Sequence, residues 1–298
     1  MGGCPTDEAM RYNESSDSEV LHLKHQTNSS AFSVSTWSLH RSLGLFYRDA
    51  QGGRVGEPKW GAGTTTLRDI PKQAAERGIG QLEICHFHFP STEPDYLISL
   101  QDALHEAGVH FLTLLIDQGD ITHPDPTERE NEIEEIRRWI RVAGASGAER
   151  VRIIAGDAAP TPETLQLSVD GLRLLCETAE EHGVRVVIEN WHPLVDRPEE
   201  LLTLLETLAG EVGLLFDFGN WHGERKYADL ARIAHLAEST HAKANYVAPG
   251  VLDEADYSRC LQILRDGGFT GPHSLIFDAL GDEWIEIVKL REFIAAAG

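Results

Sequence analysis

The chain has 298 residues, of which 41% are hydrophobic and 25% charged, a composition typical of a globular protein with a large buried core. Its 48 acidic residues outnumber its 26 basic residues, and the resulting net charge of −22 disfavours nucleic acid as a partner because such a surface repels phosphate groups. No apolar run is long enough for a membrane span, and no apolar signal-peptide core follows the N-terminus. Four scattered cysteines without a CxxC pair favour a reducing compartment, so we expect a cytoplasmic protein without a membrane partner.

Residues 1–30 differ in composition from the rest of the chain. They are rich in Ser, Asp, Glu and Asn and lack apolar periodicity, which is typical of a segment that cannot bury a core. From Phe32 onward, apolar runs recur to the end of the sequence. We therefore predict a disordered N-terminal extension over residues 1–30 and a single folded domain over residues 31–298.

Short apolar runs bounded by turn residues predict β-strands throughout the folded domain. They are expected at Phe32–Trp37, Gln81–Cys85, His110–Ile116, Arg150–Ala155, Arg185–Glu189, Val212–Asp217, Thr240–Lys243 and His273–Phe277.

Between these strands, apolar residues recur at helical spacing, as at Ile133, Ile136 and Ile140. Strands that are apolar on both faces and alternate with amphipathic helices are typical of a parallel sheet covered by helices. The sequence therefore predicts an α/β protein whose strands close into a (β/α)8 barrel, the TIM-barrel fold. An open doubly wound sheet is the alternative, but it needs a reversal of strand order that nothing in the sequence marks.

Two connections are longer than the others. One runs from His40 to about Thr65 and is rich in glycine, and the other runs from Asp117 to Arg129. Both follow strands and therefore belong to the face on which barrel active sites form. We interpret them as candidate lids, with ordinary surface insertions as the alternative.

Polar residues that suit metal binding end three successive strands. Glu189, Asp217 and His241 each follow a short apolar run, at intervals of about one strand, one helix and two short loops. In a closed barrel, the carboxyl ends of these strands converge on one mouth. Two carboxylates and an imidazole together suit a divalent cation, so we expect one Mn2+, Mg2+, Co2+ or Zn2+ ion there.

The segments around these residues carry a resemblance to a known family. They are Ile188-Glu189-Asn190, Phe216-Asp217-Phe218-Gly219-Asn220, His241-Ala242-Lys243 and Phe269-Thr270-Gly271-Pro272. With these motifs, the chain from about Phe32 onward resembles the xylose isomerase-like TIM-barrel superfamily. Its members include sugar isomerases and epimerases, inosose dehydratase, 3-dehydroshikimate dehydratase and the family of endonuclease IV.

The resemblance implies a ligand set for the metal and exposes two departures from the family pattern. Related epimerases hold one divalent cation through a Glu, an Asp, a His and a second Glu on four successive strands, and the first three correspond to Glu189, Asp217 and His241. The second Glu would fall near Ile276, which cannot bind a metal, so the nearby Asp278 is the candidate fourth ligand, with water or substrate as the alternative. Asn220 stands where the family often has a histidine.

Further candidates surround this predicted site. Glu189 is also the candidate general base. Lys243, which shares a strand face with His241, is a candidate proton donor, with His86 or His88 as the alternatives. His86, His88, Asn220 and Arg152 are candidates for substrate binding, although Arg152 also suits a partner for a barrel carboxylate.

The resemblance and the candidate residues together predict a metal-dependent isomerase or epimerase of a sugar, keto-sugar or cyclitol. The reaction would proceed by proton abstraction α to a carbonyl through an enediolate, and few basic residues near the mouth favour an unphosphorylated substrate. A dehydratase using the same site is the first alternative. An endonuclease IV-like repair enzyme and a non-catalytic sugar-binding barrel are the others. The expected partner is a small sugar or polyol, and a homo-oligomer is compatible with this reading.

Overall fold

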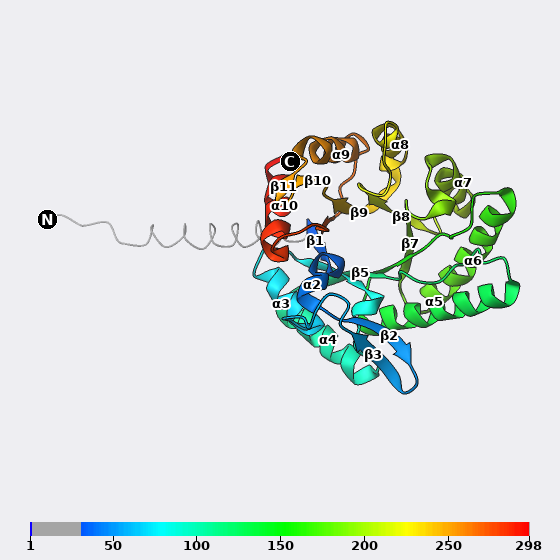
Figure 1. Cartoon of the computed structure of the whole chain (residues 1–298), viewed down its shortest axis with the longest axis horizontal. Helices are drawn as coiled ribbons and strands as arrows, with labels where there is room; N and C mark the ends of the chain where they lie inside the picture. The colour runs from blue at the N-terminus through cyan, green and yellow to red at the C-terminus, as the bar shows by residue number, and fades with distance from the viewer. Residues whose placement is uncertain (2–30, 298) are drawn as a thin grey trace.

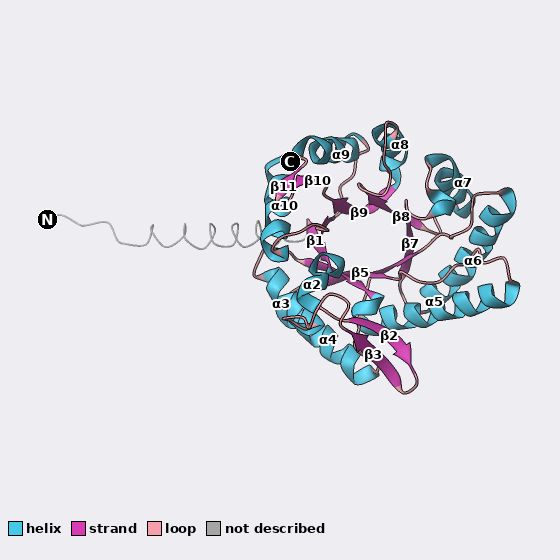
Figure 2. Ribbon diagram, viewed as in Figure 1, coloured by secondary structure: helices cyan, strands magenta, loops and turns pink. Residues whose placement is uncertain are grey.

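The computed structural model, which describes Met1 and residues 31–297, folds into a closed barrel of eight parallel strands surrounded by helices (Figures 1 and 2). Neighbouring strands follow one another along the chain, and the barrel closes where the first strand pairs with both its successor and the last strand. The barrel strands are β1 (Phe32–Ser35), β4 (Gln81–Cys85), β5 (His110–Leu115), β6 (Arg150–Ile153), β7 (Arg185–Glu189), β8 (Gly213–Asp217), β9 (Ala237–Lys243) and β12 (His273–Ile276).

The helices form an outer ring around the strands (Figure 2). They are α2 (His40–Leu43), α3 (Ile70–Ala75), α4 (Pro94–Ala107), α5 (Pro126–Ser146), α6 (Pro162–Glu181), α7 (Pro198–Leu208), α8 (Lys226–Ile233), α9 (Glu254–Asp266) and α10 (Glu283–Ala297). Short 3-10 turns occur at Thr36–Leu39, Leu67–Asp69, His86–His88, Pro193–Val195 and Ala234–Leu236.

This architecture confirms the predicted single TIM barrel. Each of the eight expected strands is present, with ends that differ by at most a few residues from the sequence-based bounds. The predicted extension over residues 1–30 lies outside the described residues apart from Met1, and it stays a prediction.

Local sequence signals explain where the main helices begin. Proline occupies the first position of α4, α5, α6 and α7, where its missing N–H costs nothing and its fixed φ suits the helix. At α5, the carboxylate of Asp125 accepts a hydrogen bond of 2.8 Å from the backbone N–H of Thr127. These residues define where each of the four helices begins and therefore where the preceding loop at the rim of the barrel ends.

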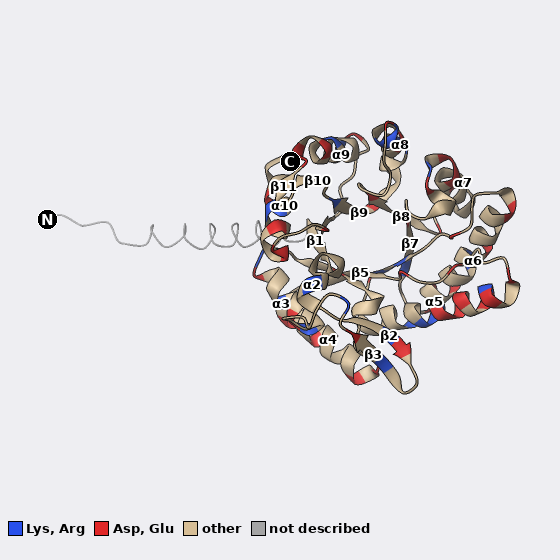
Figure 3. Cartoon of the chain, in the orientation of Figure 1, with Lys and Arg blue, Asp and Glu red and all other residues tan. Residues whose placement is uncertain are grey.

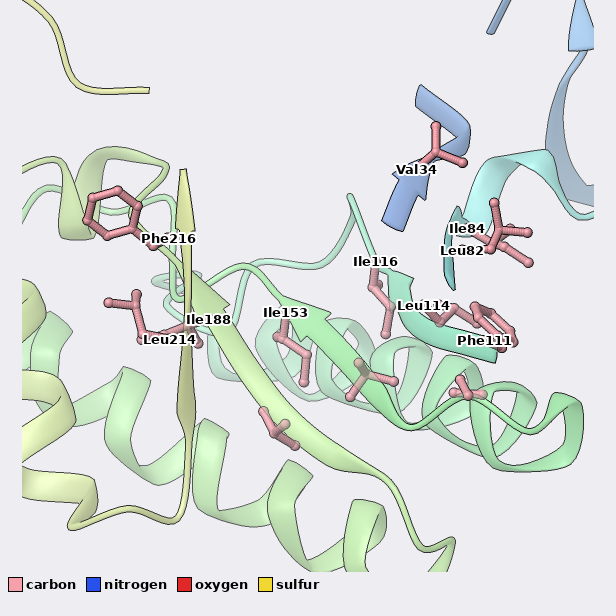
Figure 4. Close-up of a cluster of buried hydrophobic side chains, with 14 of the residues drawn as sticks. Val34, Leu82, Ile84, Phe111, Leu114, Ile116, Ile153, Ile188, Leu214 and Phe216 are labelled. Atoms are coloured by element: carbon pink, nitrogen blue, oxygen red, sulfur yellow. The ribbon is translucent and has the colours of Figure 1, made fainter. Parts of the chain in front are cut away.

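The strands divide their side chains between two environments. Outward-facing residues such as Leu82, Ile84 and Ile188 pack with the helices in one continuous apolar core (Figure 4). The alternate positions point into the barrel, where Glu83 and Glu189 are buried. The outer layer therefore stabilises the fold, and the inner layer is available for polar chemistry.

The first long connection contains a β-hairpin that the sequence analysis did not identify. Strands β2 (Phe46–Ala50) and β3 (Gly53–Glu57) pair antiparallel and project from the rim beside α4 (Figure 1). Gly52 and Gly53 have φ values of 92° and 132° in the tight turn between them, a conformation that favours glycine. A second small hairpin pairs β10 (Tyr246–Ala248) with β11 (Val251–Leu252).

The described residues can be searched for a membrane-spanning helix and for disulfide bonds. Among them, no helix is sufficiently long and apolar to span a bilayer. The described cysteines, Cys85, Cys176 and Cys260, are all free thiols.

Candidate metal centre at the mouth of the barrel

Glu189, Asp217 and His241 meet at the carboxyl end of the barrel. Glu189 and Asp217 are the last residues of β7 and β8, and the backbone register pairs Asp217 with His241 on β9. One ligand atom from each side chain lies within 4.8 Å of the others, and all three residues are buried. Strand order, as the sequence suggested, is the reason that these residues come together.

The Asp217 carboxylate is held by the backbone that follows it. Its Oδ1 accepts hydrogen bonds from the N–H groups of Gly219 at 2.6 Å and Asn220 at 2.7 Å. Its Oδ2 faces the His241 imidazole, 3.7 Å from Nδ1. Burial and the neighbouring charge of Glu189 raise the pKa of Asp217 above its ordinary value.

Asn190 fixes the position of Asp217 from the neighbouring strand. Its side-chain Oδ1 accepts a hydrogen bond of 2.7 Å from the Asp217 N–H, and its Nδ2 donates one of 3.1 Å to the Asp217 carbonyl oxygen. Asn190 is completely buried. It therefore extends the pairing of β7 and β8 by a side chain beyond the end of the strands.

Glu189 has one oxygen engaged and one without a hydrogen bond. Its Oε1 accepts a hydrogen bond of 2.8 Å from Asn220 Nδ2. Its Oε2 lies 3.1 Å from Arg152 Nε, close enough for an ion pair, but the two groups are not aligned as a hydrogen bond. Burial alone would raise the pKa of Glu189, but His241 and Arg152 outweigh it and lower that pKa, so the side chain is ionised at neutral pH.

The His241 imidazole lies between carboxylates on both sides. Its Nδ1 is 3.2 Å from Glu189 Oε1, and its Nε2 is 3.0 Å from Glu83 Oε2. Burial would lower the pKa of His241, but the charges of Glu189 and Glu83 raise it to about 10. The nitrogen that faces the two strand-end carboxylates is Nδ1.

The side chains at this centre fit a divalent cation. Glu83, Glu189 and Asp217 place three carboxylates in the barrel, each at most 5% exposed, while Arg152 is the buried guanidinium beside them. Grouped buried carboxylates are costly unless cations compensate them. Two carboxylate oxygens and an imidazole nitrogen are suitable ligands for Mg2+, Mn2+, Co2+ or Zn2+. Glu189, Asp217 and His241 would hold the ion.

The centre opens into a cavity of about 150 Å³. Its wall combines the candidate ligands with polar and aromatic side chains from most of the barrel strands. The lining residues are Ser35, Trp37, Cys85, Leu115, Asp117, Arg152, Glu189, Trp191, Asp217, Asn220, His241, Lys243 and Ile276. A space of this size suits a small polar molecule, and Arg152, Asn220 and Lys243 lie where the sequence analysis expected them.

His86 and His88 do not line this cavity, in contrast to the expectation that they bind substrate. β4 ends at Cys85, and the following 3-10 turn directs both imidazoles into the protein, where they are at most 3% exposed. His86 interacts with Gln118 at 2.9 Å and with the N–H of Asp117, and His88 interacts with Thr36 at 2.9 Å. The expectation assumed that the side-chain alternation of β4 continues past its last residue, Cys85.

Asp278 is not grouped with the three candidate ligands. β12 ends at Ile276, and the Asp278 side chain is 37% exposed, with its Oδ2 3.8 Å from Lys243 Nζ. The role of Asp278 as a fourth metal ligand stays a prediction that no contact supports. Ile276 itself lines the cavity and pairs in register with Lys243.

Two residues at this centre have contacts that sequence reasoning missed. The sequence analysis assigned no role to Glu83, and its partner, His241, follows only from the closure of the barrel. Asn190 was part of a motif without an assigned role. The position of Asn190, directly after the carboxylate that ends β7, was the sequence feature that pointed to a role at this centre.

A family model for the xylose isomerase-like TIM barrel matches residues 71–289. Among curated proteins, none matches the sequence significantly. Solved structures with the same fold include L-ribulose 3-epimerase, with a TM-score of 0.66 at 15% identity over 89% of this chain and 93% of that one.

Two further solved structures resemble this chain over most of its length. A D-psicose 3-epimerase from Clostridium cellulolyticum H10, solved with D-tagatose, has a TM-score of 0.61 at 15% identity, covering 78% of this chain and 91% of that one. A xylose isomerase-like TIM barrel protein from Mycobacterium smegmatis, in complex with magnesium, has a TM-score of 0.58 at 16% identity, covering 77% and 88%. Identities this low establish the fold alone. With the family model matched over most of the sequence, the chain belongs to the xylose isomerase-like TIM-barrel family.

Proposed function

We propose that the protein is a divalent-metal-dependent isomerase or epimerase of a small, unphosphorylated sugar, keto-sugar or cyclitol. The observation that carries this proposal is the state of Glu189. It is buried and ionised, belongs to the candidate metal centre, and has in Oε2 an oxygen without a hydrogen bond at the wall of the cavity. A positioned carboxylate of this kind is what proton abstraction requires. The likeness to sugar epimerases supports the choice of reaction.

The residues of the cavity have separate roles in this reaction. A divalent ion held by Glu189, Asp217 and His241 would polarise a carbonyl group and stabilise negative charge that develops on its oxygen. Glu189 takes the proton from the adjacent carbon through Oε2, while Asn220 keeps Oε1 in place. Lys243 returns a proton from the end of β9, two strands away from Glu189, where it neighbours Ile276.

The electrostatics of the cavity favour a neutral substrate. Arg152 already forms ion pairs with Asp117 and Glu189, and its guanidinium lies 5.0 Å from the centre of the Trp191 ring. Among the described residues of the lining, Lys243 is the remaining lysine or arginine, and His241 lies between carboxylates. With Arg152 engaged, the cavity has no cluster of free cations to bind a phosphate group.

A dehydratase is the second candidate, and Ile276 is the observation that favours it. The family pattern has a second glutamate near this position, and an apolar side chain there leaves Glu189 as the one glutamate of the described cavity wall. One base and the ammonium group of Lys243 suffice for elimination of a β-hydroxyl group. In that reaction Glu189 removes the proton, and Lys243 protonates the hydroxyl group that leaves as water.

The Glu189→Gln substitution tests the proposed function. The Mn2+-loaded protein is incubated in D2O with unphosphorylated ketopentoses, ketohexoses and inososes, and exchange of the proton α to the carbonyl is followed by NMR. The wild type should exchange this proton in at least one substrate, and Glu189→Gln should reduce the rate about 100- to 10,000-fold because an amide is not a base. Appearance of an unsaturated product with loss of water would select the dehydratase.

The control separates abstraction of the α-proton from the later return of a proton. Lys243→Met should retain α-proton exchange while slowing the formation of product, since abstraction precedes the step assigned to Lys243. A wild-type protein that binds Mn2+ but exchanges no α-proton in the panel would contradict the proposal. So would a Glu189→Gln variant with undiminished exchange.

A further inference from the structure

Glu83 is a buried carboxylate that the proposed reaction does not use. It lies on β4 with its side chain inside the barrel and is 0% exposed. It is absent from the lining of the cavity, so it does not contact substrate. A carboxylate in this position needs an explanation, because burying an ionisable group is costly when its partners are few.

The polar contact of Glu83 is with His241. Its Oε2 lies 3.0 Å from His241 Nε2, whereas its Oε1 has no hydrogen-bond partner. The nearby inward positions carry hydroxyl groups that are also buried and without partners, at Ser33, Thr113, Ser239 and Ser274. Glu83 therefore does not hold the barrel together through a network of hydrogen bonds. Its one bond leads to the metal centre.

The contact also decides which nitrogen of His241 can bind a metal. An imidazole that donates its Nε2 hydrogen to Glu83 has its lone pair on Nδ1 when it is neutral. Nδ1 is the atom that faces Glu189 Oε1 at 3.2 Å and Asp217 Oδ2 at 3.7 Å. A carboxylate behind a metal-binding histidine fixes the ring orientation and increases the basicity of the ligand.

From this geometry we infer that Glu83 is a positioning residue, which holds His241 in the Nε2–H form with Nδ1 directed at the metal. The inference rests on the proposed function, because it takes Glu189, Asp217 and His241 as metal ligands. It assigns Glu83 a role at the metal centre beyond any contribution to the stability of the barrel. The two roles are separated by Mn2+ affinity, which falls when Glu83 becomes apolar if Glu83 positions His241 and stays unchanged if Glu83 only contributes to stability.

The test uses Glu83→Leu, with Glu83→Gln as a second variant that keeps an oxygen acceptor of the same shape. Mn2+ affinity is measured by titration, the ring nitrogens of His241 by long-range 1H–15N NMR of the Mg2+- or Zn2+-loaded protein, and stability by thermal unfolding without metal. We expect Glu83→Leu to weaken Mn2+ binding about 10–100-fold. Its unfolding temperature without metal should fall, because the buried Nε2–H of His241 loses its acceptor, so Mn2+ affinity and the ring signals of the folded variant are the readouts that decide.

The NMR signature distinguishes positioning from packing. In the wild type, His241 should show one protonated nitrogen, Nε2, and a metal-bound Nδ1. This pattern should be retained at least in part by Glu83→Gln and lost in Glu83→Leu. Thr113→Val is the matched control: it changes the inward residue paired with Glu83 on β5 and should leave Mn2+ affinity within about twofold of wild type.

Three results would overturn the inference while leaving the proposed function intact. They are Mn2+ affinity and ring signals of Glu83→Leu equal to those of the wild type, equal weakening by Thr113→Val, and a lower unfolding temperature with unchanged affinity. A wild type that binds no Mn2+ would instead refute the proposed function, and the inference with it, before any variant is compared.

Discussion

At the scale of single residues, the candidate centre depends on side chains that fix other side chains. Asn220 holds Glu189, Asn190 holds the backbone of Asp217, and Glu83 holds His241. The chemically active groups are therefore placed by contacts between different strands of the barrel, and each contact can be removed separately.

Removing the Asn190 amide should destabilise the protein more than it changes the cavity. Asn190→Ala leaves the N–H and carbonyl groups of Asp217 without their buried partners. We expect the free energy of unfolding to fall by about 1–3 kcal/mol, measured by urea denaturation of the metal-free protein. Asn220→Ala, which removes a partly buried amide from the same mouth, is the control and should cost less. An equal decrease in the free energy of unfolding of the two variants would show that the buried contacts of Asn190 stabilise the fold no more than the partly buried amide of Asn220.

Sequence reasoning singled out Glu189, Asp217 and His241 because they lie at or near the ends of three successive strands: Glu189 and Asp217 end β7 and β8, and His241 lies two residues before the end of β9. It misplaced His86 and His88 because alternation was assumed to continue beyond Cys85, where the backbone turns. The contact between Glu83 and His241 joins residues 158 positions apart, and only the closed barrel brings them together. Contacts across the barrel axis have no local signature in the sequence.

At the scale of elements, the buried side chain of Arg54 is one of the contacts that attach the β2–β3 hairpin to the barrel, together with the Asp49–Arg138 ion pair and the stacking of Phe46 on Phe87. Arg54 donates hydrogen bonds to the carbonyl oxygens of Phe89 at 2.8 Å, Tyr47 at 2.7 Å and His86 at 3.3 Å. Its guanidinium also lies 4.7 Å from the centre of the Trp139 ring. The hairpin is thereby joined to the turn that follows β4.

Arg54→Ala should release the hairpin without unfolding the barrel. The three carbonyl contacts disappear, so amide hydrogen exchange over residues 46–57 should accelerate by tenfold or more, while exchange in the barrel strands stays unchanged. Arg48→Ala is the matched control, since Arg48 lies on the same hairpin but is 56% exposed and pairs with Glu57 at the surface. Similar exchange in the two variants would contradict the role of Arg54.

The hairpin also shows what a sequence can signal and what it cannot. Gly52 and Gly53 mark the tight turn, but the flanking strands Phe46–Ala50 and Gly53–Glu57 contain charged residues and glycines in place of a clear apolar alternation. They do not bury one face of a sheet, and so the period-2 pattern that revealed the barrel strands is missing. The interactions of Arg54 supply the stability that the pattern lacks.

At the scale of the whole molecule, charge and burial together determine the response to acid. Acidic and basic residues lie along the outer helices (Figure 3), while several histidines are enclosed by the fold. Burial lowers the pKa of His86 to about 4, of His88 to about 3 and of His273 to about 4. All three are neutral in the folded protein at pH 7.

These histidines should make the protein less stable as the pH falls from about 6.5 towards 4. In this window the unfolded chain takes up protons that the folded protein excludes, so each histidine contributes stability above pH 6.5 that is lost on acidification. The loss is on the order of 3 kcal/mol or less per histidine, measured by urea denaturation at a series of pH values. His273→Phe should make the free energy of unfolding less dependent on pH over this range, because it removes one of the three histidines. A free energy of unfolding that is constant over this range would contradict the prediction.

Closure of the barrel by the pairing of β1 with β4 has a consequence for the behaviour of the protein at high concentration. Every barrel strand has a neighbour on both sides, so the barrel offers no free backbone edge to another molecule. The open edges of the β2–β3 hairpin are protected by charges on Arg48, Asp49 and Glu57. The strand Phe32–Ser35 carries no charge at all. If the barrel opened beside it, an unprotected edge would form, and aggregation would start at that seam.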